Sequence, residues 1–147
     1  MERSSILIGL LLLFAFIAPL FYTINIKKKN NAIWEQKIRK KAAQMHLELD
    51  ELEINTKLFL GINRAKQILI YGNLDEENLK IKSFGLTGIT CEIKQNRSKE
   101  KGIEQIVMLL KNQLQQSQIV FYNEKDDYNV EALAQLELAQ KWQKVLS

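Results

Sequence analysis

The amino-acid sequence predicts an α+β protein with a membrane-spanning helix at its N-terminus, a strand-rich domain after it and a helix at its C-terminus. Three observations predict this fold class. Residues 4–26 carry no charge and are mostly apolar, several short segments within residues 55–122 alternate apolar with polar side chains, and residues 130–146 return to a helical spacing. Periods of about 2 and about 3.6 residues are those that strands and helices impose on buried side chains.

The apolar run of residues 6–26 predicts a transmembrane anchor, which we assign to residues 1–26. As a helix that rises about 1.5 Å per residue, the run would reach roughly 31 Å, the thickness of the hydrocarbon core of a bilayer. A chain of 147 residues could hardly cover so apolar a helix on every side, which argues against a buried core helix. A cleaved signal peptide is the other alternative, but Ala15 and Ala18 lie three residues apart, whereas the small residues before a cleavage site lie two apart.

Positive charge is distributed unequally around this run. Seven cations follow it closely: Lys27, Lys28, Lys29, Lys37, Arg39, Lys40 and Lys41. Lysine and arginine beside a span are retained in the cytoplasm. The sequence therefore predicts a single-pass protein of the inner (plasma) membrane with its N-terminus outside and its C-terminal domain in the cytoplasm. Lys27, Lys28 and Lys29 are then predicted to contact anionic lipid headgroups, and the single cysteine, Cys91, agrees with a reducing compartment.

Residues 27–54 are predicted to form a basic juxtamembrane segment and an amphipathic helix. A one-faced apolar stripe predicts the helix at residues 31–49: Trp34, Ile38, Ala42, Met45, Leu49 and Leu52. The stripe leaves three arrangements open, namely packing on the chain's own domain, a parallel coiled coil that makes a homodimer through residues 34–52, and a helix lying on the bilayer. Residues 54–147 carry thirteen cations against eleven acids, so the domain lacks the basic face that nucleic-acid binding requires.

Residues 55–147 are predicted to form a domain of about six to seven antiparallel strands. Alternating apolar residues or short apolar runs predict six of them: residues 56–63, 67–71, 79–83, 89–94, 103–111 and 118–122. Most of the connections are short, which favours antiparallel neighbours. A turn is predicted at residues 84–88 from its two glycines, and a loop at residues 95–102 from its polar composition.

The domain ends in a predicted amphipathic helix at residues 130–146. Ala134, Leu138, Trp142 and Val145 share one face of this helix. Trp142 is the largest side chain available to fill a core, and we interpret it as the residue that closes the domain. Stacking of its ring on a ligand is the alternative.

Antiparallel strands followed by a C-terminal helix with a tryptophan resemble the pleckstrin-homology-like fold, in which the strands form a partly open barrel. The stretches LFLGINRAKQILIY, IKSFGLTGITCEI, IVFYN and AQKWQKVLS also resemble a group of uncharacterised bacterial single-pass membrane proteins. The resemblance covers about residues 43–147 and implies a fold, not an activity. Pleckstrin-homology-like domains usually have seven strands, one more than the six segments above. Such domains commonly bind protein segments along a sheet edge or in a groove beside the helix.

The chain offers few residues with the spacing of a catalytic or metal-binding site. His46 and Cys91 are its single histidine and single cysteine and lie far apart, whereas a zinc site needs about four ligands. His46 is expected to be solvated near a helix end, and Cys91 to face inward from a strand. Asp75-Glu76-Glu77 and Asp126-Asp127 lie in predicted polar loops and are expected to be solvated. We therefore expect no enzymatic activity, no cofactor and no metal.

Two functional classes remain. The first is a non-enzymatic, membrane-anchored interaction module that binds a protein partner. The second is a module that binds anionic lipid headgroups, because cations recur in strands and loops that could converge. The predicted lipid-contacting residues are Lys80, Lys82, Arg97 and Lys99, together with Lys27, Lys28 and Lys29. Glu92, Glu100 and Glu104 lie close in sequence and would weaken such a patch, so a plain solvated surface is the alternative to the second class.

Overall fold

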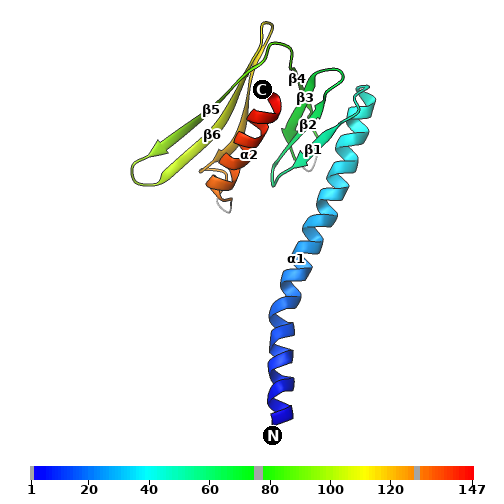
Figure 1. The fold of residues 1–147 in the computed structure, drawn as a ribbon, viewed down its shortest axis with the longest axis vertical. Coiled ribbons are helices and arrows are strands. Elements are labelled where there is room, and N and C mark those ends of the chain that lie inside the picture. Colours follow the sequence, from blue (N-terminus) through cyan, green and yellow to red (C-terminus); the bar gives the residue numbers. More distant parts are fainter. Residues whose placement is uncertain (1, 75–77, 128–129) are drawn as a thin grey trace. The chain divides into compact units, whose positions relative to one another are not determined.

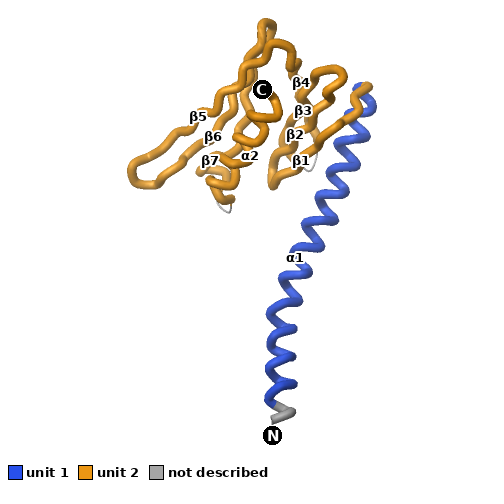
Figure 2. Tube along the Cα trace, in the orientation of Figure 1, with its two compact units in different colours: residues 1–45 blue, residues 46–147 orange. Residues whose placement is uncertain are grey.

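The computed structural model describes residues 2–74, 78–127 and 130–147. The chain divides into two compact units, residues 1–45 and residues 46–147 (Figure 2). The first unit is one long helix, and the second contains two β-sheets and a helix (Figure 1). The predicted α+β class, with a helix at each end of the strand-rich part, is confirmed.

Helix α1 runs from Glu2 to Gln44 without interruption and includes Pro19. Its apolar side chains at residues 6–26 are exposed. Within the described ranges, α1 is the one helix that is long and apolar enough to cross a membrane. The predicted amphipathic helix at residues 31–49 is not a separate element, because α1 continues through the basic stretch. Lysine and glutamine are good helix formers, so the composition of that stretch provides no reason for a break.

The chain after α1 differs from the prediction. His46 has a left-handed backbone conformation with φ 58°, which is common in residues that end a helix, and its side chain is exposed as expected. Strand β1, Glu51–Ile54, follows. Leu52, which the apolar stripe placed on the helix, pairs with Gly61 of the next strand. The predicted helix end at residue 49 is therefore wrong.

Among the described residues, seven antiparallel strands form two sheets, which confirms the upper end of the predicted number. One sheet has the order β1-β2-β3-β4 and the other has the order β5-β6-β7. Their bounds are Leu58–Asn63 for β2, Ile68–Asn73 for β3, Lys82–Gly85 for β4, Thr90–Ser98 for β5, Gly102–Lys111 for β6 and Gln116–Asn123 for β7. Within each sheet, every strand pairs with its neighbours in sequence, as short connections favour.

Two of the predicted segments differ most from the observed strands. The strand predicted at residues 79–83 instead begins at Lys82 and includes Gly85, a residue of the predicted turn. The loop predicted at residues 95–102 is much shorter, because β5 continues through its first half and pairs with the start of β6. Gly102, with φ 81°, provides the left-handed residue at the end of the tight turn. Cross-strand pairing thus makes a strand of residues whose polar composition predicts a loop.

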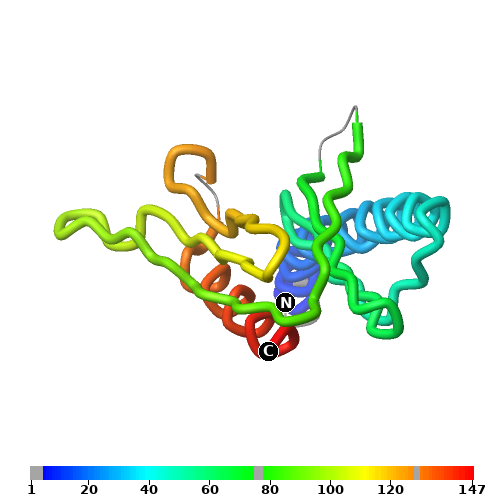
Figure 3. Tube along the Cα trace, turned by 90° about the horizontal axis from the view of Figure 1, so that it is seen from above, coloured from blue at the N-terminus to red at the C-terminus, as the bar shows by residue number. Residues whose placement is uncertain are grey.

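One hydrophobic core joins the two sheets and helix α2, Ala132–Leu146. Apolar residues at alternate positions of β2 and β6 contribute to it, as their pattern predicts. Helix α2 packs on the three-stranded sheet, against β5, β6 and β7 (Figures 1 and 3). It is hydrogen-bonded to both sheets, because Trp142 Nε1 donates to Glu53 Oε2 of β1 at 2.9 Å and Gln143 Nε2 donates to the Cys91 carbonyl oxygen of β5 at 3.1 Å.

The buried face of α2 is rotated from the predicted one. Its buried residues are Gln135, Ala139, Trp142 and Leu146, whereas Ala134 is exposed. Trp142 is 1% exposed, which confirms that its ring closes the core. Lys141 Nζ donates to the same Glu53 oxygen at 2.7 Å, so the indole and the ammonium group share one carboxylate. The carboxylate of Glu53 on β1 therefore fixes which face of α2 is turned toward the core.

Candidate functional site

The titratable side chains do not gather into a metal-binding cluster within the part of the chain that the structure describes. No group of three or more His, Cys, Asp and Glu residues there could hold a metal ion. The predicted acidic loop Asp75-Glu76-Glu77 lies outside the described residues.

Cys91 is partly buried and packs against the core, which confirms that it faces inward. Burial takes its thiolate away from water and raises the pKa of Cys91 from 9.0 to about 11. A thiol with a raised pKa is a poor nucleophile at neutral pH, because the thiolate is the reactive form.

We expect Cys91 of the folded chain to react with iodoacetamide at pH 8 about 100-fold more slowly than after unfolding in urea. The reason is that a pKa higher by about two units lowers the thiolate fraction by that factor. Because the fold disfavours the thiolate, Cys91 contributes stability below about pH 9 that is lost as the pH rises through about 11. Mass spectrometry of quenched samples gives both rates, and equal rates would contradict burial of the thiol.

A cleft of about 400 Å³ opens where the β1–β2 turn, β7 and α2 approach one another. Its apolar lining comes from Leu58, Leu74, Val120, Phe121 and Val130. Polar side chains from the same elements complete the lining. A cleft with an apolar surface and a small number of polar groups is the usual form of a binding site.

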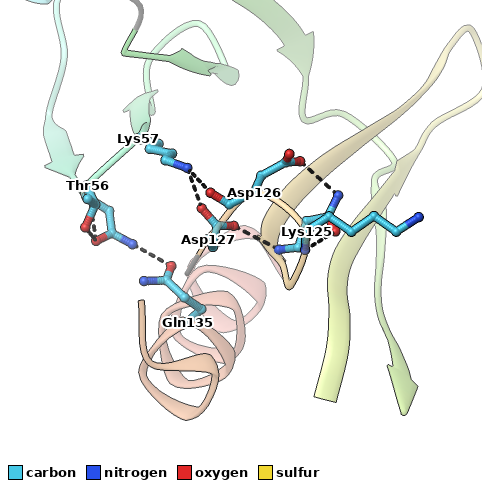
Figure 4. Close-up of polar contacts among 8 residues, drawn as sticks. Thr56, Lys57, Lys125, Asp126, Asp127 and Gln135 are labelled. Carbon is cyan, nitrogen blue, oxygen red and sulfur yellow. Dashed lines mark hydrogen bonds and ion pairs between the residues drawn. The ribbon is translucent and has the colours of Figure 1, made fainter. Parts of the chain in front are cut away.

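Polar contacts tie the two sides of this cleft together (Figure 4). Lys57 Nζ lies 2.9 Å from Asp127 Oδ1 and donates to the carbonyl oxygen of Asp126 at 2.6 Å. Asn55 Nδ2 donates to Gln135 Oε1 of α2 at 2.5 Å. The side chain of Asp127 is only 14% exposed, so the expectation of a solvated carboxylate is wrong for this residue. Its ion pair with Lys57 compensates for the water that it loses.

A second cleft of about 340 Å³ adjoins the first and shares Leu58, Asn73 and Val120 with it. Lys80 and Lys82 line this second cleft. We name the two clefts together the β7 groove, because Val120 of β7 lines both. The side chain of Val120 is 40% exposed, which leaves an apolar contact surface in the middle of the groove.

Strand β7 forms an edge of its sheet, since among the described strands it pairs with β6 alone. At the β6–β7 turn, Asn112 N donates to the Gln115 carbonyl oxygen. Opposed residues of an antiparallel ladder alternate between hydrogen-bonded and non-hydrogen-bonded pairs. Counted from this bond, the N–H and C=O groups of Gln116 and Gln118 point away from β6, as does the N–H of Val120, after which the register shifts. β7 therefore presents a row of backbone groups that β6 does not use, and this row meets the β7 groove at Val120.

The structure places the predicted lipid-contacting residues of the domain in two regions. Lys80 and Lys82 meet in the second cleft of the β7 groove. Arg97 lies on β5 and Lys99 is exposed in the turn after it, and neither of them lines the β7 groove. The three lysines at residues 27–29 are exposed on α1 of the first unit.

Asn55, Asp127 and Gln135 line the cleft but are absent from the site predicted from sequence. Gln135 did carry a local signal, because it precedes Trp142 by seven residues and therefore lies on the same helix face. A polar residue on that face indicates a partner in the core or in a cleft. Asn55 and Asp127 carry no comparable signal.

Comparison of the chain with protein-family models, with curated proteins and with solved structures found no match.

Proposed function

We propose that this chain is a non-enzymatic interaction module that α1 anchors in the inner (plasma) membrane, with its N-terminus outside and its second unit in the cytoplasm. The exposed apolar helix and the cations that directly follow it support this placement. We also propose a pleckstrin-homology-like fold for the second unit. Seven strands in sheets of four and three, followed by a helix that packs on the second sheet and is hydrogen-bonded to β1 of the first, support that assignment.

The observation that carries the proposed function is the β7 groove. The exposed apolar side chain of Val120 lines it, and the outward backbone groups of Gln116 and Gln118 continue the same strand edge beside it. A protein segment in an extended conformation can add to such an edge as a further strand. Its backbone then provides affinity, and the side chains at alternate positions provide specificity. The proposed partner is therefore an extended segment of another protein.

Lys80 and Lys82 favour a second function, the binding of an anionic lipid headgroup. Both line the β7 groove, and neither makes an ion pair with another residue of the described ranges. An ammonium group binds a phosphate oxygen through its concentrated charge. The two functions differ in what contacts Val120, a protein or a lipid.

A photoreactive benzoylphenylalanine at position 120 of the full chain should form a protein adduct when native membranes are irradiated. The same amino acid at position 133 is the matched control, because Leu133 is 60% exposed on α2. Gln118→Pro should abolish the adduct, since it removes an outward N–H without breaking the ladder to β6. Adducts from both positions, or an adduct that persists in Gln118→Pro, would contradict the groove. A lipid adduct at position 120 would support headgroup binding.

Lys99→Cys in a Cys91→Ala background should resist a membrane-impermeant maleimide in intact cells and react once the membrane is permeabilised. The proposed orientation places this turn in the cytoplasm, beyond the reach of the reagent. Labelling in intact cells would contradict the orientation. Loss of residues 1–26 from the mature protein, read by mass spectrometry, would contradict the anchor.

A further inference from the structure

Strand β5 is the other edge of the three-stranded sheet, and its hairpin with β6 extends past α2 (Figures 1 and 3). It pairs with β6 in regular register from Thr90 to Asn96, and the register shifts between Asn96 and Arg97. Gly88, with φ 65°, lies in the turn that precedes the strand. The regular part of β5 is thus bounded on both sides, and its midpoint is Ile93.

Every second residue of β5 directs its backbone groups away from β6. The alternation derived above for β6 and β7 continues across β6, so the N–H and C=O groups of Cys91, Ile93 and Gln95 face outward. The hydrogen bond from Gln143 Nε2 to the Cys91 carbonyl oxygen agrees with this direction. A carbonyl oxygen has two lone pairs, so this one can still accept from another strand.

Two opposite charges flank the midpoint of β5. The side chains of Glu92 and Lys94 are both exposed. Neither makes an ion pair with another residue in the described part of the chain. Single-sign charges on an edge strand discourage pairing with a second sheet. Opposite charges placed symmetrically about Ile93 instead make the edge complementary to itself.

We propose that two copies of this chain associate through β5, antiparallel and about a two-fold axis at Ile93, so that their three-stranded sheets become one sheet of six strands. Glu92 of one protomer then lies opposite Lys94 of the partner subunit, and symmetry repeats the pair. These are non-hydrogen-bonded positions, at which Cα atoms are about 4.5 Å apart and side chains interact most closely. The association needs neither the β7 groove nor its occupant.

The same two charges select the register. A shift by two residues in one direction brings Lys94 opposite Lys94 of the partner subunit, and a shift in the other direction brings Glu92 opposite the partner's Glu92. Like charges directly opposite each other are destabilising. After a shift by one residue, each outward-facing residue of one β5 would lie opposite a residue of the partner's β5 whose backbone groups point toward that chain's own β6. The hydrogen bonds between the two β5 strands could then not form. Among these registers, only the one centred on Ile93 allows the two strands to form hydrogen bonds and also places opposite charges across from each other.

Disulfide trapping of the full chain in detergent micelles tests this register in a Cys91→Ala background. Chains with Glu92→Cys, mixed with chains that carry Lys94→Cys, should form a covalent dimer on mild oxidation, because opposed residues lie within disulfide range. Each variant alone should remain monomeric on a denaturing gel, since its two cysteines would be diagonal, about 7–8 Å apart. Equal dimer from a single variant, or none from the mixture, would overturn the proposal.

Charge exchange on the full chain gives an independent test by analytical ultracentrifugation in micelles. Glu92→Lys and Lys94→Glu should each weaken association about tenfold or more, because symmetry introduces two like-charge pairs. The double variant E92K/K94E should restore it. Both positions are exposed, so folding should be unaffected. A wild-type chain that stays monomeric would overturn the proposal. So would a dimer that survives both single exchanges but is lost in Met45→Asp, a change at a residue of the 34–52 stripe that is 40% exposed.

Discussion

Replacement of Trp142 by alanine is expected to lower the free energy of unfolding of the second unit by about 3–5 kcal/mol. The side chain is 1% exposed and belongs to the core that α2 shares with both sheets, so its truncation leaves a large cavity. The change also removes the hydrogen bond from Trp142 Nε1 to Glu53 Oε2. Domains are stable by roughly 5–15 kcal/mol, so the loss is a large part of the total.

Pulse proteolysis of the full chain in urea and detergent micelles measures this change as a lower midpoint of unfolding. Trp142→Phe is the matched variant, because it keeps an aromatic ring in the core and removes the indole N–H. We expect it to cost about 1–3 kcal/mol, the typical penalty for a buried group that loses its partner. Leu133→Ala, at an exposed position of the same helix, should leave the midpoint unchanged. An unchanged midpoint for Trp142→Ala would show that α2 is not part of the core.

Gly72→Ala is expected to destabilise the second unit by about 1–3 kcal/mol through overpacking. A Cβ at this position of β3 would lie 2.3 Å from the carbonyl oxygen of Lys80 and 2.9 Å from Cε1 of Phe59. Phe59 is fully buried, so its ring has little room to move. The backbone must shift instead, next to the second cleft of the β7 groove, which Gly72 also lines.

Gly85→Ala in the adjacent strand is the matched control for this substitution. The nearest atom to a Cβ there is Asn112 Nδ2 at 3.7 Å, an ordinary contact distance. The free energy of unfolding of Gly85→Ala, obtained from its midpoint in urea, should stay within about 0.5 kcal/mol of that of the unsubstituted chain. If the two alanine variants unfold at the same urea concentration, Lys80 and Phe59 do not lie as close to Gly72 as the structure places them.

Several elements could be predicted because their cause is local. An uncharged run at residues 6–26 has one regular structure that satisfies its backbone within the segment, and that structure is a helix. Leu58, Leu60 and Ile62 alternate at the strand period and lie in the core. Cys91 and Trp142 contact the core as expected. These features follow from the spacing and chemistry of neighbouring residues.

Strand ends could not be predicted where two periods fit the same residues. Leu52 continues the helical stripe after Leu49 and also alternates with Ile54. Pairing with Gly61 decides for the strand. Residues 95–98 are polar, yet they form part of β5 because β6 supplies their hydrogen bonds. Both outcomes depend on a partner strand, which a local pattern does not contain.

The sequence by itself determined the exposed apolar helix, the strand-rich class of the second unit and the closing role of Trp142, because each depends on local period and side-chain volume. Only the tertiary structure decided that Asn55 meets Gln135 and that Lys57 meets Asp127 across the β7 groove. It also decided which backbone groups of β5 and β7 face outward. These features require segments that are distant in sequence to pair in one register, and cross-strand and helix–sheet contacts set that register.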